Sequence, residues 1–254
     1  LGNLTTKEFD PILMLDSFDS INPDDYTAGF PMHPHRGIET ISYVSRGKMV
    51  HRDSLGNEAG ISDGEVQWMN SGSGIMHEEM VPAAERLLGV QLWLNLPAKD
   101  KMSKPSYNSI KNEDIKEIEI EGGKIRLLAG KYGEHEGYKG DYLSMDYYDI
   151  HLNADAEVTL TMEEDDSVMV FTLLGDVYID GEHIEEKTAV KLTEGDSLTI
   201  KNGNEKAQVL YMNSRALNEP VAWAGPIVMN TQEELQKAFL ELRSNTFIKE
   251  TAEY

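Results

Sequence analysis

The stretches FPMHPHRGIE, residues 30–39, and GSGIMHEEM, residues 72–80, together contain three of the seven histidines of this chain. In an extended strand, side chains two residues apart point to the same face. The two histidines of the first stretch therefore share a face, as do the histidine and the second glutamate of the second. If the stretches form neighbouring strands, three imidazoles and one carboxylate meet at one point, a ligand set suited to a divalent transition metal. The predicted ligands are His33, His35, His77 and Glu79.

For any one of these histidines, the alternative is a partly buried side chain bonded to a backbone carbonyl, or a polar strand end in solvent. Two pairs that match in strand parity are harder to obtain by chance, so the sequence favours a metal site. His51 stands beside a turn. It is predicted to be a surface histidine, and the alternative is a residue that supports the metal site.

The composition excludes several classes of protein. The 254 residues suffice for one large or two ordinary domains. A formal net charge of -22 repels phosphate backbones and anionic lipids, so neither direct nucleic-acid binding nor membrane docking is expected. Because there is no cysteine, nitrogen and oxygen ligands must hold any metal.

The sequence also leads to expectations for location and assembly. The sequence has neither an apolar run long enough to span a membrane nor a signal-peptide pattern at its start. We therefore expect a cytoplasmic protein and a monomer. The chain begins at Leu1 rather than at a methionine, so we expect that further residues preceded it.

Short runs with strand periodicity, separated by glycine and aspartate turns, predict an all-β fold. In residues 90–96, apolar side chains alternate with Gln91, Trp93 and Asn95 until Pro97 ends the run. Many short strands and few helical segments are typical of a sandwich or barrel.

The second half of the chain repeats the first in outline. The strand, turn and strand around Gly47 resemble those around Gly175, and the turn at Gly64 resembles the turn at Gly195. A stretch rich in glycine and charge between Gly130 and Gly140 predicts a boundary that separates residues 1–133 from 134–254. In this alignment the positions of the metal ligands are taken in the second copy by Thr161, Glu163 and Gln208. The second copy therefore lacks a ligand set.

Near the end of the chain the period changes from that of strands to that of a helix. Thr231 and Glu234 form a predicted capping box. Leu235, Ala238 and Leu242 follow at helical spacing, and this apolar stripe is expected to cover a barrel.

Several of these segments resemble the pirin family, and the resemblance spans most of the chain. They are residues 30–40, 67–69, 74–80, 91–93 and 225–231. Pirins are bicupins, with two tandem cupin, or jelly-roll-like, β-barrel domains and a metal only in the first. The resemblance implies an N-terminal metal-binding cupin domain at 1–133 and a C-terminal cupin domain at 134–254 that has no metal site and carries the helix. It places the ligands on the four residues chosen from strand parity.

The resemblance also implies a function. Several pirins are quercetin 2,3-dioxygenases, oxidoreductases that cleave the flavonol quercetin with dioxygen. Iron is the usual metal, so Fe(II) is expected here, with Mn, Ni, Co or Zn as alternatives. Glu79 would be both ligand and catalytic base. Other pirins are iron-binding regulatory proteins that dock on a transcription factor or a metabolic enzyme, and this is the alternative function.

Two further alternatives concern single residues. The general cupin pattern would use Glu39 as the carboxylate, and Glu39 has the strand parity of His35. It lies about 13 Å beyond His35 along a straight strand, however, whereas Glu79 is two residues from His77, so Glu79 is favoured. Glu78 is expected to face outward. Plain barrel core is predicted for Met32, Ile41, Tyr43, Trp68 and Met76, and the alternative is an apolar mouth for an aromatic substrate.

Overall fold

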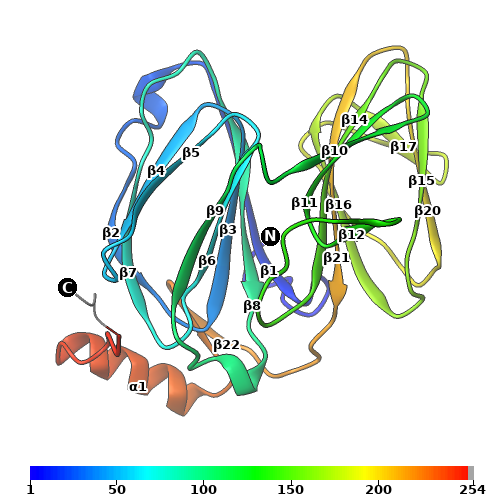
Figure 1. The fold of residues 1–254 in the computed structure, drawn as a ribbon. Helices are drawn as coiled ribbons and strands as arrows, with labels where there is room; N and C mark the ends of the chain where they lie inside the picture. Colours follow the sequence, from blue (N-terminus) through cyan, green and yellow to red (C-terminus); the bar gives the residue numbers. More distant parts are fainter. Residues whose placement is uncertain (251–254) are drawn as a thin grey trace. The chain divides into compact units, whose positions relative to one another are not determined.

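The protein folds as two compact β units, as shown by a computed structural model that describes residues 1–250 (Figure 1). Unit 1 contains Leu1–Lys111 and the chain from Leu217 onward, and unit 2 contains Asn112–Ala216. Neighbouring strands in the main sheets run antiparallel. The prediction of an all-β protein with two cupin-type domains and one C-terminal helix is confirmed.

Unit 1 is built from two sheets. One sheet has the strand order β1-β8-β3-β6-β9 and the other has the order β2-β7-β4-β5. The strands are β1 (Ile12–Ser20), β2 (Phe30–His35), β3 (Ile38–Arg46), β4 (Lys48–Asp53), β5 (Glu58–Ser62), β6 (Glu65–Asn70), β7 (Ile75–Met80), β8 (Leu87–Asn95) and β9 (Ser106–Ile110). Short 3-10 turns lie at Pro23–Asp25 and Ala98–Asp100. The two sheets place both histidine stretches on neighbouring strands.

The C-terminal part of the chain returns to unit 1. The strands β22 (Ala222–Ala224) and β23 (Ile227–Met229) form a ribbon, and helix α1 (Gln232–Arg243) packs on it. Thr231 and Glu234 make the predicted capping box. Leu235 and Ala238 are buried in a small apolar core with Ile227 and Met229, so the helix covers this ribbon as its stripe predicted.

Unit 2 has the same two-sheet plan. Its sheets have the orders β10-β11-β14-β21-β16-β19 and β15-β20-β17-β18, and β12 and β13 form a separate ribbon. The strands are β10 (Lys116–Ile120), β11 (Gly123–Ala129), β12 (Lys131–Tyr132), β13 (His135–Glu136), β14 (Met145–Leu152), β15 (Glu157–Thr161), β16 (Asp166–Leu174), β17 (Val177–Ile179), β18 (Glu182–Ile184), β19 (Ala189–Lys191), β20 (Ser197–Asn202) and β21 (Ala207–Arg215).

The two units are copies of one topology. The order β1-β8-β3-β6 of unit 1 recurs as β14-β21-β16-β19, and β2-β7-β4-β5 recurs as β15-β20-β17-β18. Gly47 and Gly175 occupy the same turn, as predicted. The predicted match of Gly64 with Gly195 is wrong, because Gly64 precedes β6, whose counterpart is β19, whereas Gly195 precedes β20. The two glycines lie in turns of similar sequence, but the strand order shows that these turns are not equivalent.

In unit 2, the strands that correspond to those of the metal ligands carry other residues than the sequence predicted. The counterparts of β2 and β7 are β15 and β20, so Thr161, Glu163 and Gln208 are not the equivalent positions as a set. The interior of this strand pair holds Val158 opposite Ile200 and Leu160 opposite Leu198, all buried in one apolar core. Unit 2 therefore fills with aliphatic side chains the place where unit 1 has histidines.

The packing units also differ from the predicted division at residues 133 and 134. Strands β10 and β11 precede that boundary, but β11 pairs with β14 and so belongs to unit 2. Helix α1 lies beyond the boundary and packs in unit 1. Among the described residues, every helix is too short or too polar to cross a membrane.

Candidate metal centre

The pairing of β2 with β7 brings the two histidine stretches together. His33 lies directly opposite His77 in the register, and an irregularity of the pairing between Phe30 and His33 adjusts the strand just before the first histidine. His35 and His77 are 2% and 1% exposed, and His33 is partly exposed. The three imidazoles therefore converge on the interior of unit 1, with His33 nearest to solvent.

The ligand atoms of the three rings lie close enough to share one ion. One nitrogen from each of His33, His35 and His77 lies within 4.8 Å of the others. The Nε2 atoms of His33 and His35 are 3.0 Å apart. Within residues 1–250, this is the one group of histidine and acidic side chains that meets the distance requirement for a metal site.

Backbone carbonyls fix which nitrogen of each ring carries the proton. Nδ1 of His33 lies 2.9 Å from the carbonyl oxygen of Pro31, and Nδ1 of His35 lies 3.1 Å from that of Pro226. A carbonyl oxygen only accepts, so both Nδ1 atoms must donate, and in a neutral ring Nε2 then holds a lone pair. Two lone pairs facing each other at 3.0 Å repel unless a cation lies between them. This donor set fits a divalent transition metal.

Burial keeps His35 and His77 in the neutral form that binds metals. Burial, together with the neighbouring His33, lowers the pKa of His35 from 6.5 to about 3. The pKa of His77 is also lowered, first by burial and then by the charges of His35 and His33. At neutral pH both rings are therefore uncharged, as metal coordination requires.

Glu79 shares the interior face but is not among the side chains whose ligand atoms lie within 4.8 Å of one another. Its carboxylate accepts hydrogen bonds from the side-chain amides of Gln67 and Gln91, the second at 3.2 Å. Both amides also donate to Ser42. Burial raises the pKa of Glu79, and the amides oppose that rise. The structure thus brings together three of the four predicted ligands. The fourth, Glu79, lies on the same interior face and is hydrogen-bonded to the side-chain amides of Gln67 and Gln91.

The other carboxylate candidates lie elsewhere. Gly37, with φ +79°, separates β2 from β3, so strand parity does not carry over from His35 to Glu39. Ser42 and Glu79 both accept from the side-chain amide of Gln91, so Ser42 lies on the interior face. Glu39 has the opposite strand parity to Ser42 and so points to the other face of its sheet. Glu78 faces outward, as predicted, and lies 3.8 Å from Arg52.

Three of the five residues considered for a substrate mouth are core residues instead. Ile41 lies opposite Trp68 in the β3–β6 register, one residue out of phase with the inward pair of Ser42 and Gln67. Ile41, Tyr43 and Trp68 are therefore buried on the face of the sheet that points away from the histidines. Met32 remains beside His33 and is 49% exposed, as is Phe30 of the same strand.

His51 is the residue that the sequence placed most wrongly. It was predicted at the surface, yet it is fully buried, and its Nδ1 lies 3.3 Å from Nδ1 of His77. Its ring stacks on Tyr107 with centroids 4.0 Å apart. The period-2 signal was present, since His51 has the parity of Met49, a core residue, but the adjacent turn obscured it.

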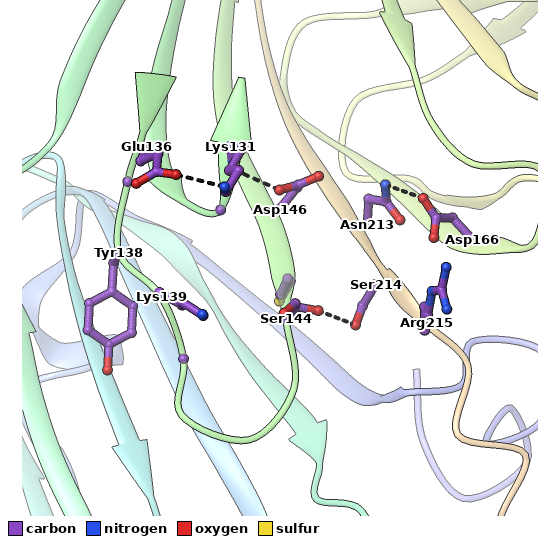
Figure 2. Close-up of a pocket in the computed structure, with 14 residues that line it drawn as sticks. Lys131, Glu136, Tyr138, Lys139, Ser144, Asp146, Asp166, Asn213, Ser214 and Arg215 are labelled. Carbon is purple, nitrogen blue, oxygen red and sulfur yellow. Dashed lines mark hydrogen bonds and ion pairs between the residues drawn. The ribbon is translucent and has the colours of Figure 1, made fainter. Parts of the chain in front are cut away.

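A separate cavity of about 530 Å³ lies in unit 2. Figure 2 shows its charged and polar lining, in which Lys131 pairs with Glu136 and Asp166 accepts from Asn213. No histidine lines it. This cavity is therefore chemically unlike the imidazole cluster of unit 1.

Comparisons with known proteins agree with this architecture. The family model "Pirin" matches residues 2–94, and the model "Pirin C-terminal cupin domain" matches residues 147–248. Pirin of Homo sapiens is 35% identical over 254 residues, which cover 96% of this chain and 85% of that protein. A Pseudomonas aeruginosa protein named "Putative quercetin 2,3-dioxygenase" is 38% identical over 253 residues, covering 96% of this chain and 88% of that protein.

A solved structure gives the same result. The crystal structure of quercetin 2,3-dioxygenase from Acinetobacter baumannii matches with a TM-score of 0.87 and 33% identity, over 95% of this chain and 87% of that chain. Two cupin-type barrels in one chain, with an imidazole cluster in the first, define a bicupin. The chain belongs to the pirin family.

Proposed function

We propose that this protein is a metal-dependent dioxygenase that cleaves a flavonol such as quercetin. The observation that carries the proposal is the convergence of His33, His35 and His77, whose ligand nitrogens lie within 4.8 Å of one another, with Nδ1 of His33 and of His35 held by backbone carbonyls. The names of the Pseudomonas aeruginosa relative and of the Acinetobacter baumannii structure support the choice of substrate.

The proposed ligands are His33, His35, His77 and Glu79. When bound, a divalent ion such as iron(II) supplies Lewis acidity and redox chemistry toward dioxygen. Three nitrogen donors and one carboxylate leave two positions free on an octahedral ion but none on tetrahedral zinc. Iron(II) is therefore proposed ahead of zinc, with manganese, nickel and cobalt as alternatives.

Glu79 is the proposed catalytic base as well as a ligand. Because burial raises its pKa, the carboxylate binds a proton more readily than an exposed glutamate does. It can therefore take the proton of a flavonol 3-hydroxyl group. The amides of Gln67 and Gln91 hold the carboxylate in place while it acts.

The site also offers apolar surface for an aromatic substrate. Phe30 and Met32 lie on the strand that carries His33, and each is about half exposed. His35, His77 and Glu79 are buried in the interior of unit 1. We propose that the flavonol rings rest on Phe30, whose register partner is Glu79, and that the hydroxyl group reaches inward past His33.

The test is oxygen-dependent loss of quercetin. The protein is loaded anaerobically with Fe(II), quercetin is added, and the flavonol absorbance is followed after oxygen is admitted. We expect loss of absorbance with the wild type and with Glu78→Gln, an outward-facing control on the same strand, but not with His35→Ala. No turnover with iron, manganese, nickel or cobalt would refute the proposed function.

A further inference from the structure

A hydrogen-bonded chain leads from His77 to a carboxylate outside the predicted ligand set. His51 lies on β4, next to β7, where its register partner is Glu79 and that of Asp53 is His77. Nδ1 of His77 is 3.3 Å from Nδ1 of His51, and Nε2 of His51 is 2.8 Å from Oδ2 of Asp53. The side chains of His51 and Asp53 are both 0% exposed.

The loop after β4 fixes the orientation of the Asp53 carboxylate. Oδ1 accepts from the backbone N–H groups of Leu55 at 2.8 Å and Asn57 at 3.1 Å. Oδ2 accepts from the side-chain amide of Asn57 at 2.9 Å. The second oxygen is therefore turned toward His51 by a loop that gives the carboxylate no freedom to rotate.

The positions of the protons in the hydrogen bonds from His77 through His51 to Asp53 follow from the Asp53 carboxylate, which can only accept. The carboxylate accepts, so Nε2 of His51 donates, and in the neutral ring Nδ1 of His51 is then an acceptor. Nδ1 of His77 must donate to it, and Nε2 of His77 is left with a lone pair. That Nε2 atom is buried and has no hydrogen-bond partner among the described residues.

We propose that Asp53 and His51 are positioning residues that hold His77 in the tautomer able to bind a metal through Nε2. Stacking on Tyr107, with the ring planes 14° apart, fixes the orientation of the His51 ring. Partners of this kind, behind the ligands, change metal affinity by about 10- to 100-fold. The inference rests on the proposed metal centre and is independent of the flavonol chemistry.

The isosteric substitution Asp53→Asn tests the proposal. Its amide oxygen would stay on the two backbone N–H groups, because only an oxygen accepts there. The amide NH2 group would then face His51 and Asn57, and Asn57, which now donates to Oδ2, would have to turn its side-chain oxygen toward it. The NH2 group would donate to Nε2 of His51, which reverses the hydrogen bonds and places a proton on Nε2 of His77. We expect the Kd for Co(II), measured by competition with a chelator, to rise about 10- to 100-fold.

Glu58→Gln is the matched control. It removes one negative charge from the neighbouring strand β5, where Glu58 is exposed and pairs only with the exposed Arg52 among the contacts described here. We expect its Kd for Co(II) to stay within about twofold of the wild type, because surface pairs contribute little. Wild-type affinity in Asp53→Asn, or an equal loss in both variants, would overturn the proposal.

A second measurement needs no variant. The 15N–1H correlation spectrum of the metal-free wild type reports which nitrogen of each imidazole is protonated. We expect the proton of the neutral His77 ring on Nδ1. A proton on Nε2 would overturn the proposal that His51 and Asp53 set the tautomer of His77, and this measurement decides the matter even if Asp53→Asn fails to fold. If His77 has the expected tautomer but the iron-loaded protein leaves quercetin intact, the proposed dioxygenase function is refuted and the positioning role of Asp53 and His51 is not.

Discussion

The guanidinium of Arg36 lies 2.8 Å from the carboxylate of Glu241, which joins the residue after His35 to helix α1. Arg36 is 2% exposed and also donates to the carbonyl oxygens of Ser73 at 2.8 Å and Phe247 at 2.9 Å. Its guanidinium stands 4.2 Å from the centre of the Phe247 ring. The buried guanidinium of Arg36 thus connects the end of the strand that carries His33 and His35 to Glu241, about two hundred residues later in the chain.

The first prediction concerns this ion pair. Glu241→Gln leaves a buried guanidinium without its counter-charge, so we expect the free energy of unfolding to fall by about 1–3 kcal/mol. Lys237→Gln is the control, because Lys237 is exposed on the same helix and should change stability by less than about 0.5 kcal/mol. Urea unfolding measures both. Equal stabilities of the two variants would mean that the pair contributes nothing.

The second prediction compares two glycines with the same backbone angle. Gly37 and Gly181 both have φ +79°, but a Cβ at Gly37 would lie 1.9 Å from the carbonyl oxygen of Val228, whereas nothing lies within 4 Å at Gly181. Gly181→Ala should therefore cost only the left-handed penalty of about 1–2 kcal/mol. Gly37→Ala should cost more and also weaken Co(II) binding, because it displaces the β2–β3 turn beside His35. Similar unfolding curves and equal metal affinity for the two variants would contradict this reading.

Strand periodicity was enough to predict the convergence of His33, His35 and His77, because alternation along a strand depends only on local backbone geometry. The same rule failed at Glu39. Gly37 interrupts the strand with a positive φ, and parity cannot be counted across such a break. Sequence reasoning therefore succeeds within a strand and fails across its ends.

Contacts distant in sequence account for the remaining differences. His51 supports His77 only because β4 pairs with β7, and the carbonyl of Pro226 reaches His35 from the far end of the chain. Neither contact has a local signal. Helix α1 was correctly predicted from its capping box, but no local pattern indicates that it packs in unit 1.

The third prediction is a pH dependence of stability in the metal-free protein. The pKa of His35 is about 3 in the folded chain and about 6.5 when unfolded, so below pH 6.5 the unfolded chain binds the extra proton. Stability is therefore full above pH 6.5 and falls toward pH 3, by at most about 1.4 kcal/mol per pH unit for this group. In His35→Gln, the free energy of unfolding measured with urea should change less steeply with pH between pH 6.5 and 5. An unchanged slope would contradict the assignment of this pH dependence to His35.

The last prediction concerns the number of metal ions. Because Val158, Leu160, Leu198 and Ile200 fill the corresponding interior of unit 2, we expect one ion per wild-type chain and none in His35→Ala. His183→Ala is the control, since that histidine lies in unit 2 with its side chain 47% exposed, and it should retain one ion. Elemental analysis after dialysis gives the count, and circular dichroism checks that each variant is folded. An ion that persists in folded His35→Ala would place the metal outside the three-histidine cluster.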